Sequence, residues 1–235
     1  MNTIELKNVS VRLGEVDALR EASVALDGRT IAVIGDNGSG KSTLARVVGG
    51  LVPARAGEVR VLGLDPVRQA AELRRRVAFV FSNPDAQIIM PTVAEDVAFS
   101  LRDRGMSRRE RSERVAAALD RFGLTELAAR SSHDLSGGQK QLLALCGALV
   151  REPELVIADE PTAFLDARNA RRITAHLFDG GPHRLLLVTH DLSLARRCEC
   201  AVLVAGGRVV LAGDPGLVIA AHEKSLDDHP LPPRG

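Results

Sequence analysis

Short, almost wholly apolar runs recur along the chain, and turn residues bound each of them. They lie at residues 31–34, 77–81, 155–158 and 185–188. Strands that are covered on both faces of a parallel sheet have this pattern. Residues 136–151 instead place apolar side chains at 142, 145, 146 and 149, which is one face of a helix. The chain therefore predicts an α/β fold.

The middle of the chain has a different pattern. No buried strand is expected between residues 84 and 132, whereas segments 95–101, 108–122 and 124–129 have helical periodicity. We therefore predict a helical subdomain over roughly residues 84–150, inserted in the α/β core. Near the end, two strand-like runs surround Gly206 and Gly207, which predicts a hairpin over residues 202–213.

The two ends of the chain differ in composition. Residues 4–13 alternate enough to form a further strand. Residues 223–235 are polar and proline-rich, so they are predicted to be a poorly ordered tail. Residues 1–222 are predicted to form a single domain.

The overall composition argues against two classes of partner. The 235 residues carry 31 basic and 30 acidic side chains, and aromatic residues make up only 3%. Neither a global positive field nor base-stacking platforms are therefore expected, so no nucleic-acid partner is predicted. No run approaches the ~18 apolar residues that span a bilayer, and the start does not resemble a signal peptide. The chain is expected in the cytosol, and a partner must supply any membrane span.

The three cysteines are too few and too unevenly spaced for a disulfide framework. Cys198 and Cys200 have the spacing of half a zinc site, but no second ligand pair is evident. Two ordinary thiols at the start of a strand are the preferred interpretation.

A glycine-rich loop, GDNGSGKST at residues 35–43, follows the first apolar strand and opens a helix. It fits the pattern G-x-x-x-x-G-K-[ST], in which backbone N–H groups and a helix N-terminus surround phosphates. Lys41 is predicted to reach the β- and γ-phosphates, and Ser42 to ligate Mg²⁺. The residues predicted to bind the nucleotide are Gly35, Asp36, Asn37, Gly38, Ser39, Gly40, Lys41, Ser42 and Thr43.

Two further strands end in groups suited to phosphate chemistry. LVIADE (residues 155–160) places Asp159 and Glu160 at a strand's carboxyl end, where ligands of α/β sheets bind. Asp159 is predicted to hold Mg²⁺ and Glu160 to polarise the attacking water. LLLVTHD (residues 185–191) ends similarly at His190, which can contact a γ-phosphate oxygen.

A second anion site is predicted at HDLSGGQKQ, residues 133–141. Ser136 is a candidate N-cap, and the two glycines after it leave backbone N–H groups open. Because the phosphate loop already serves one nucleotide, this second helix N-terminus must meet a nucleotide bound elsewhere.

These motifs, in this order and spacing, resemble those of ABC-transporter ATPase subunits, over nearly the whole chain. The resemblance implies a P-loop NTPase core with a mixed, mostly parallel sheet, N-terminal antiparallel strands and a helical subdomain insert. It implies ATP and Mg²⁺ as cofactors and a head-to-tail dimer of two ATPase subunits. Glu160 would be the general base, His190 the switch histidine, and residues 164–166 a loop that crosses the dimer interface. The residues that would cover the other subunit's ATP are Ser136, Gly137, Gly138 and Gln139.

Two positions depart from that family's pattern. Ser82 stands where FQNP would place the glutamine of a hinge that senses the γ-phosphate, and serine is too short to replace it. Gln87, five residues later, is the nearby glutamine that would have to take over that function. Leu13 lies where relatives have the aromatic residue that stacks on adenine, so weaker base selectivity is expected.

Three classes of protein remain open at this point: an importer ATPase, a soluble ABC ATPase acting on DNA or ribosomes, and an unrelated phosphate-loop kinase or GTPase. The segment LSGGQ (residues 135–139), called the signature below, disfavours the third class. The single short domain disfavours the second class. NPDAQIIMPTVAEDVAF (residues 83–99) resembles the energy-coupling-factor (ECF) group of importers. LSGGQKQLLAL and residues 158–173 resemble its biotin-type ATPase, with a cobalt, nickel or other vitamin importer as the alternative.

The ECF resemblance also implies partners and a location. A transmembrane coupling protein and a substrate-binding membrane protein would complete the complex at the cytoplasmic face of the plasma membrane. The ATPase subunit would not touch the transported substrate. The arginine-rich residues 102–114 also contain Asp103, Glu110 and Glu113, so an ion-paired, solvated helix is preferred over contact with a coupling protein or lipid headgroups.

Overall fold

The computed structural model describes residues 2–102, 105–179 and 181–228. The chain forms two compact units. The first contains the described residues up to Arg74 and from Arg184 onward, and the second contains those from Arg75 to His183. The helix α2 (Ala70–Arg76) leads from the first unit into the second.

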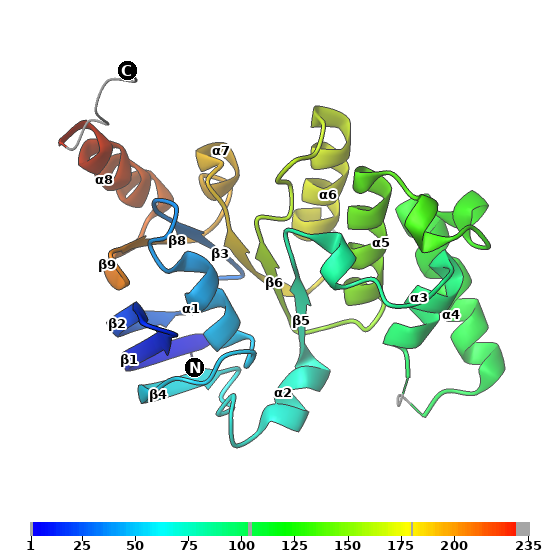
Figure 1. Cartoon of the computed structure of the whole chain (residues 1–235), viewed down its shortest axis with the longest axis horizontal. Coiled ribbons are helices and arrows are strands. Elements are labelled where there is room, and N and C mark those ends of the chain that lie inside the picture. The colour runs from blue at the N-terminus through cyan, green and yellow to red at the C-terminus, as the bar shows by residue number, and fades with distance from the viewer. Residues whose placement is uncertain (1, 103–104, 180, 229–235) are drawn as a thin grey trace. The chain divides into compact units, whose positions relative to one another are not determined.

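The first unit begins with a three-stranded antiparallel sheet, visible at the blue end of the chain (Figure 1). Its central strand, β1 (Ile4–Leu13), pairs with β2 (Val16–Leu26) on one side and β4 (Ala56–Val61) on the other. The buried residues of β1 alternate with exposed or half-buried ones on each side of a register shift between Leu6 and Val9, which is the period-2 pattern of a sheet with one covered face. The predicted N-terminal antiparallel strands are confirmed.

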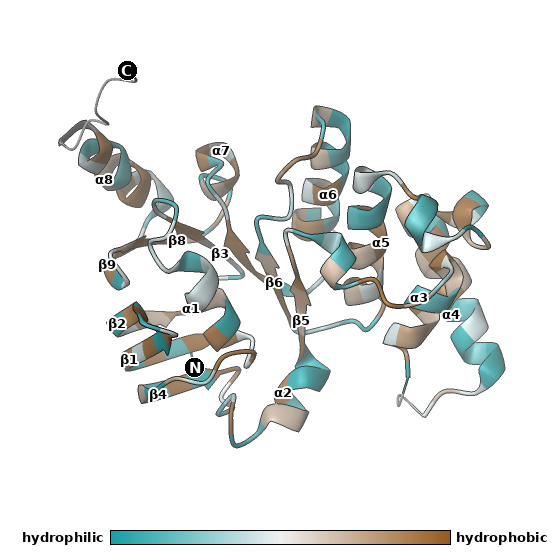
Figure 2. Cartoon of the chain, in the orientation of Figure 1, coloured by the Kyte–Doolittle hydropathy of each residue, from teal (hydrophilic) through white to brown (hydrophobic). Residues whose placement is uncertain are grey.

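A second set of strands in the first unit carries the phosphate loop. Its order is β7 (Arg184–Val188), β3 (Thr30–Ile34), β8 (Cys200–Ala205) and β9 (Arg208–Gly213). β3 runs parallel to β7 and β8, whereas β9 returns antiparallel to β8. Every residue of β3 is buried, and the apolar character of β3, β7 and β8 is visible in Figure 2. The predicted buried strands and the hairpin are confirmed here.

Three helices complete the first unit: α1 (Lys41–Val48), α7 (Leu192–Ala195) and α8 (Pro215–Asp228). α8 extends six residues into the segment that the sequence predicted to be poorly ordered. No proline or glycine interrupts residues 217–228, and the Ser225 hydroxyl donates to the His222 carbonyl at 2.6 Å. The prediction is therefore wrong for residues 223–228, and residues 229–235 lie outside the described part of the chain.

The second unit combines two parallel strands with helices. β5 (Val77–Val80) pairs with β6 (Leu155–Asp159). The helices are α3 (Val93–Ser100), α4 (Arg108–Phe122), α5 (Gly137–Leu149) and α6 (Ala167–Asp179), with short 3₁₀ turns at Pro84–Ala86, Thr125–Leu127 and Ser132–Asp134. α5 is buried along most of its length because α3, α4 and α6 pack around it (Figure 1).

The start of each of three helices is fixed by a capping box. Ser or Thr at the N-cap accepts from the third helical N–H, and Glu or Gln at that position accepts from the N-cap N–H. The pairs are Thr92 with Glu95, Ser107 with Glu110, and Ser136 with Gln139. These boxes explain why α3, α4 and α5 begin within two residues of their predicted starts.

One predicted helix is wrong. Residues 124–129 form only the three-residue 3₁₀ turn Thr125–Leu127. The carbonyl of Ala128 accepts from Ala94 N at 2.9 Å, and that of Arg130 accepts from Val93 N at 3.2 Å. These carbonyls therefore satisfy the first N–H groups of α3 instead of extending a helix of their own.

Among the described residues, no helix is both long and apolar enough to cross a membrane.

Candidate functional site

The phosphate loop is built from the first unit alone. β3 ends at Ile34, three glycines follow with positive φ, and α1 begins at Lys41. The φ values are 139° at Gly35, 78° at Gly38 and 108° at Gly40. These conformations require glycine, and they turn successive backbone N–H groups toward one side of the loop. In the described part of the chain, no side chain caps the N-terminus of α1.

Lys41 is the charged centre of this loop. Its side chain is 6% exposed, and its ammonium group donates to the carbonyls of Gly35 at 2.8 Å and Asp36 at 2.7 Å. The charge is thus fixed at the mouth of the loop by the loop's own backbone. Ser39 is also buried, and among the described residues its hydroxyl has no hydrogen-bond partner.

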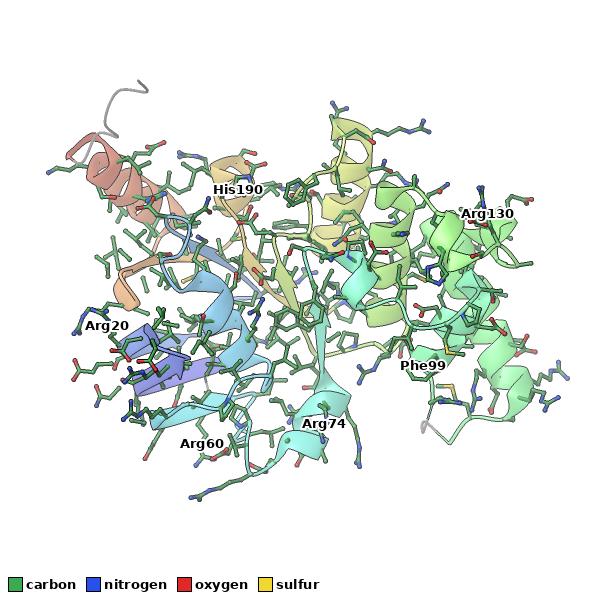
Figure 3. The ribbon with its side chains drawn as sticks, in the orientation of Figure 1. Arg20, Arg60, Arg74, Phe99, Arg130 and His190 are labelled. Atoms are coloured by element: carbon green, nitrogen blue, oxygen red, sulfur yellow. The ribbon has the colours of Figure 1, made fainter. Side chains whose placement is uncertain are left out.

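His190 leaves the sheet at the same edge as the phosphate loop. β3 and β7 run in parallel register, with Val33 opposite Val188, and Thr189 N donates to the carbonyl of Val33 at 3.2 Å. The His190 side chain is exposed beyond the end of β7, next to α7 (Figure 3). The structure therefore places the predicted histidine and loop on one edge of one sheet.

Asp191 fixes the backbone that follows His190. It caps α7 by accepting from Ser193 N at 2.8 Å, the Ser193 hydroxyl at 2.6 Å and Leu194 N at 3.4 Å. Burial alone would raise the pKa of this carboxyl, but the hydrogen bonds from Ser193 and Leu194 outweigh burial and lower it. The ionised carboxylate is thus a structural anchor for the histidine's position.

Leu13 is the last residue of β1 and lies opposite Val16 in the β1–β2 pair. Both side chains are exposed, at 41% and 66%. Exposed apolar side chains at a strand end are available for contact with a flat apolar ligand.

The two carboxylates of the second unit follow β6 directly. Asp159 is the last residue of the strand and is 4% exposed. Glu160 is half-buried and has a φ of 50°, an uncommon left-handed conformation for a residue with a side chain. Ala163 N donates to the Glu160 carbonyl at 3.1 Å. The two adjacent carboxylates therefore extend from different backbone conformations, a strand at Asp159 and a left-handed turn at Glu160.

The predicted signature forms the N-terminus of α5. Ser136 accepts from Gln139 N at 3.4 Å, and its own N–H donates to the Gln139 side chain at 2.9 Å. A Cβ built at Gly137 would meet nothing within 4 Å, so this residue is open. A Cβ at Gly138 would overlap the side chain of Asn169 in α6. One glycine is thus needed for packing, and the other leaves the helix N-terminus accessible.

Sequence reasoning did not identify Asn169 as part of this site. Its N–H donates to Asp166 at 2.9 Å, and its side-chain amide donates to the same carboxylate at 2.6 Å. These bonds lower the pKa of Asp166. Asp166 lies three residues before Asn169, at the start of α6. This is the spacing of a local side-chain hydrogen bond, so the sequence did contain a signal for this pair.

Phe164 is an unusual residue in the loop between β6 and α6. Its side chain is fully exposed, and its φ of 62° is rare for an aromatic residue. A cavity of about 380 Å³ lies beside it, lined in part by Ser82, Gly137 and Lys140. The signature, the segment after β5 and this loop therefore share one cavity within the second unit.

The segment after β5 is held by two glutamines. Phe81 N donates to the side chain of Gln87 at 3.3 Å, and Gln141 donates to the Phe81 carbonyl at 3.1 Å. Ser82 itself is exposed. Gln141 was also missed by sequence reasoning, although a polar residue in an otherwise buried stretch of α5 was its signal.

The arginine-rich helix forms ion pairs at its surface. Arg109 lies 2.8 Å from Glu113, and Arg114 lies 2.6 Å from Glu152. The guanidinium of Arg102 lies 4.8 Å from the centre of the Phe99 ring, which Figure 3 labels. Asp103 and residue 104 lie outside the described residues. These contacts support the preferred ion-paired interpretation, while contact with a coupling protein or lipid headgroups stays the alternative hypothesis.

Half of a zinc site was the alternative interpretation for two of the three cysteines. All three are free thiols, and burial raises the pKa of Cys146 and Cys198 to about 12. Within the described ranges, Cys198 and Cys200 belong to no group of three metal-ligating side chains.

Each unit, taken by itself, carries groups that suit a nucleotide with magnesium. The loop supplies a lysine, glycine N–H groups and a helix N-terminus for phosphate oxygens. Ser42 offers a hydroxyl oxygen and Asp159 a buried carboxylate, which are the oxygen donors that magnesium prefers.

Comparisons with known proteins agree with this chemistry. The family model described as ABC transporter matches residues 21–163. A putative ABC transporter ATP-binding protein of Deinococcus radiodurans is 42% identical over 95% of this chain and 98% of its own length. The energy-coupling factor transporter ATP-binding protein EcfA1 of Latilactobacillus sakei is 37% identical over 92% and 80%. The biotin transport ATP-binding protein BioM of Rhizobium etli is 38% identical over 95% and 98%.

Two solved structures have the same fold. One is cbiO1 from Clostridium perfringens, described as part of the ABC transporter complex cbiONQ. Its TM-score is 0.82 at 28% identity, covering 97% of this chain and 96% of that one. The other is the ATP-binding cassette MJ0796, a dimer bound to ADP and Pi, with a TM-score of 0.77 at 28% identity and coverage of 90% and 98%.

Proposed function

This chain belongs to the ABC transporter family and is an ATP-hydrolysing subunit of a membrane transporter complex. From that premise we propose that it is the ATPase of an ECF-type importer and energises vitamin uptake. Its fold is that of the ABC ATPases, a P-loop α/β fold with an N-terminal antiparallel sheet and a mixed sheet. Such ATPases act as dimers within their transporter complexes.

The phosphate chain of ATP is proposed to bind residues 35–43. Lys41 supplies the positive charge for the β- and γ-phosphates, and the N–H groups of Gly38 and Gly40 surround them. Ser42 and Asp159 are the proposed magnesium ligands, and magnesium, when bound, neutralises charge on these phosphates. Leu13 is the proposed contact for the adenine, which its exposed apolar side chain suits.

Glu160 is the proposed general base. Its carboxylate accepts a proton from the attacking water, and the left-handed backbone at this residue sets its direction. His190 is proposed to hydrogen-bond a γ-phosphate oxygen, because it lies at the sheet edge that carries the phosphate loop. Glu160 would therefore act on the attacking water, and His190 on the phosphoryl group that the water attacks.

One observation carries the proposal of a head-to-tail dimer. Ser136 is the N-cap of α5, and the next residue, Gly137, has open space where a side chain would lie. The N–H of Gly137 is one of the donors that a helix N-terminus leaves unsatisfied. This is a second anion site in a chain that already has a phosphate loop. We propose that Ser136, Gly137, Gly138 and Gln139 cover the ATP of the partner ATPase, so that ATP closes the dimer and hydrolysis reopens it.

The remaining partners follow from the ECF assignment. They are a transmembrane coupling protein and a substrate-binding membrane protein, with this subunit at the cytoplasmic membrane face and not in contact with the substrate. Biotin is the proposed substrate because of the likeness to BioM. The alternative candidate is uptake of cobalt, nickel or another vitamin, since the likeness to EcfA1 supports the ECF class without naming a substrate.

Purification of the Glu160→Gln variant from its host's membranes with ATP tests these proposals. Loss of the base should stop hydrolysis and retain the closed dimer, so mass spectrometry should identify a coupling protein and a biotin-binding membrane protein. A different substrate-binding protein would remove biotin and keep the importer. Recovery of only ribosomal, DNA-bound or no partners would contradict the importer assignment.

Lys41→Ala is the matched control for this experiment. It removes the charge from the phosphate loop, so ATP should neither bind tightly nor close the dimer. Normal ATP turnover by Glu160→Gln would contradict the assignment of the general base, independently of which partners are recovered.

A further inference from the structure

The turn between β8 and β9 contacts the phosphate loop through one residue. Gly207 N donates to the carbonyl of Ser39 at 2.9 Å, and the Gly207 carbonyl accepts from Arg20 N at 2.8 Å. Arg20 lies on β2, and its side chain is labelled in Figure 3. Gly207 therefore links the phosphate loop to a strand of the antiparallel sheet, although these segments are far apart in sequence.

The three segments approach closely at two glycines, so that an added Cβ would displace the backbone at Gly40 and crowd it at Gly207. A Cβ built at Gly207 would lie 3.1 Å from the Ala18 carbonyl oxygen and 3.4 Å from Leu19 Cα. A Cβ at Gly40 would lie 2.6 Å from the same oxygen and 3.5 Å from Gly207 Cα. The neighbour Gly206 also has a positive φ, but a Cβ there would meet nothing within 4 Å.

The same hairpin supports the other end of the loop. A Cβ at Gly35 would overlap the carbonyl oxygen of Val204, near the end of β8. The backbone from Gly35 to Gly40 is thus bounded by Val204 at its start and by Gly207 at its end. The N–H groups of this backbone are those expected to face phosphates, so their direction depends on these contacts.

We propose that Gly207 is a positioning residue for ATP binding, acting through the Ser39 carbonyl. Its N–H holds the Ser39 carbonyl on the side of the loop that faces away from the phosphates. The N–H groups of Gly40 and Lys41 then point toward the phosphates. The hairpin is accordingly part of the nucleotide site, although it contributes no side chain to it. This inference rests on the proposed function of residues 35–43.

Gly207→Ala, with Gly206→Ala as its matched control, tests the proposal in the full chain. Both substitutions place alanine at a positive φ, but only the first adds a Cβ against Ala18. The dissociation constant of ATP with Mg²⁺, measured by calorimetry, should rise about tenfold in Gly207→Ala and stay near wild type in Gly206→Ala. The melting temperature without nucleotide should fall in both.

A third variant separates backbone strain from the contact. Asparagine tolerates a positive φ better than alanine, yet Gly207→Asn still adds the Cβ against Ala18. Its ATP dissociation constant should therefore stay raised while its melting temperature partly recovers. Hydrogen exchange of the peptide containing Ser39 should be faster than in wild type before nucleotide is added, which remains measurable if Gly207→Ala folds poorly.

Three results would overturn the proposal. Equal ATP affinity in all variants would show that the turn does not position the loop, and an equal loss in Gly206→Ala and Gly207→Ala would attribute the effect to hairpin strain. Recovery of ATP affinity in Gly207→Asn would show that strain, and not the contact, mattered. If instead residues 35–43 do not bind ATP, the result is different, because Lys41→Ala would then bind ATP as well as wild type does.

Discussion

The side-chain amide of Gln87 donates to the backbone carbonyl of Ala144 at 2.9 Å and so links the segment after β5 to the middle of α5. The same amide accepts from Phe81 N at 3.3 Å. One side chain therefore joins the end of a strand to the helix that carries the signature at its N-terminus. Gln87 is already used in this link, which argues against its replacing the glutamine absent at position 82.

Gln87→Leu should destabilise the chain and weaken this link. Leucine has a similar size but makes neither hydrogen bond, so the half-buried N–H of Phe81 would lose its partner. We expect the free energy of unfolding to fall by about 1–3 kcal/mol in urea titrations. Ser82→Ala, at an exposed position in the same segment, is the control and should change it by less than about 0.5 kcal/mol. A similar loss in both variants would contradict the link.

Ser82→Gln should alter coupling more than nucleotide affinity. Ser82 is exposed and lines the cavity beside Gly137, so a longer amide can enter that space without displacing core residues. We expect the ATP dissociation constant to change less than about threefold, within 0.7 kcal/mol. The ratio of transport to ATP turnover in the assembled transporter should change more. No change in either quantity would show that the hinge does not use this position.

Patterns that depend on local chemistry predicted the fold well. β3, β6 and β7 are wholly or nearly buried, so their apolar runs were informative, and Ser136, the predicted N-cap, is the N-cap of α5. α4 begins and ends where the periodicity placed it. The glycine spacing predicted a loop whose backbone N–H groups surround phosphates, and Gly35, Gly38 and Gly40 have positive φ values in that loop.

Features that depend on contacts distant in sequence were not predictable. Residues 124–129 have helical periodicity, but the carbonyls of Ala128 and of the following Arg130 bond to α3, which no local pattern shows. Gly207 was predicted only as a turn residue, because its bonds to Ser39 and Arg20 join segments that the sequence does not place together. Asn169 was missed for the same reason, since its contact with Gly138 arises from packing of α6 against α5.

Phe164→Gly should stabilise the isolated chain and weaken its dimer. The exposed ring makes no packing contribution that the fold would lose, and glycine relieves the positive φ. We expect the free energy of unfolding to rise by about 1 kcal/mol. In the Glu160→Gln background, the ATP-dependent dimer should dissociate at higher concentration, because the loop would lose its apolar contact.

Light scattering at several protein concentrations measures this dimer. Ile89→Ala is the control, because it removes another exposed apolar side chain of the second unit at a residue without a positive φ. It should leave dimer formation unchanged. A Phe164→Gly protein that dimerises like its parent would place this ring outside the dimer interface.

His176 should make the chain less stable as the pH falls. Its ring stacks on Phe122 with centroids 4.0 Å apart. Burial lowers its pKa below the ordinary 6.5, and the charges of Arg121 and Arg172 lower it further. The unfolded chain therefore takes up a proton at a higher pH than the folded chain does. The stability that neutral His176 contributes is fully present above about pH 6.5 and is lost as the pH falls toward the lower, folded value.

His176→Phe keeps an aromatic ring against Phe122 but cannot be protonated. Its free energy of unfolding, from urea titrations between about pH 8 and pH 5, should fall less steeply below about pH 6.5 than that of wild type. Above that pH the two curves should run parallel, which is the internal control for the loss of any other contact. Equal slopes over the whole range would show that the histidine is protonated as readily in the folded chain as in the unfolded one. The stack on Phe122 would then impose no electrostatic cost, and the acid sensitivity of the chain would have to come from other groups.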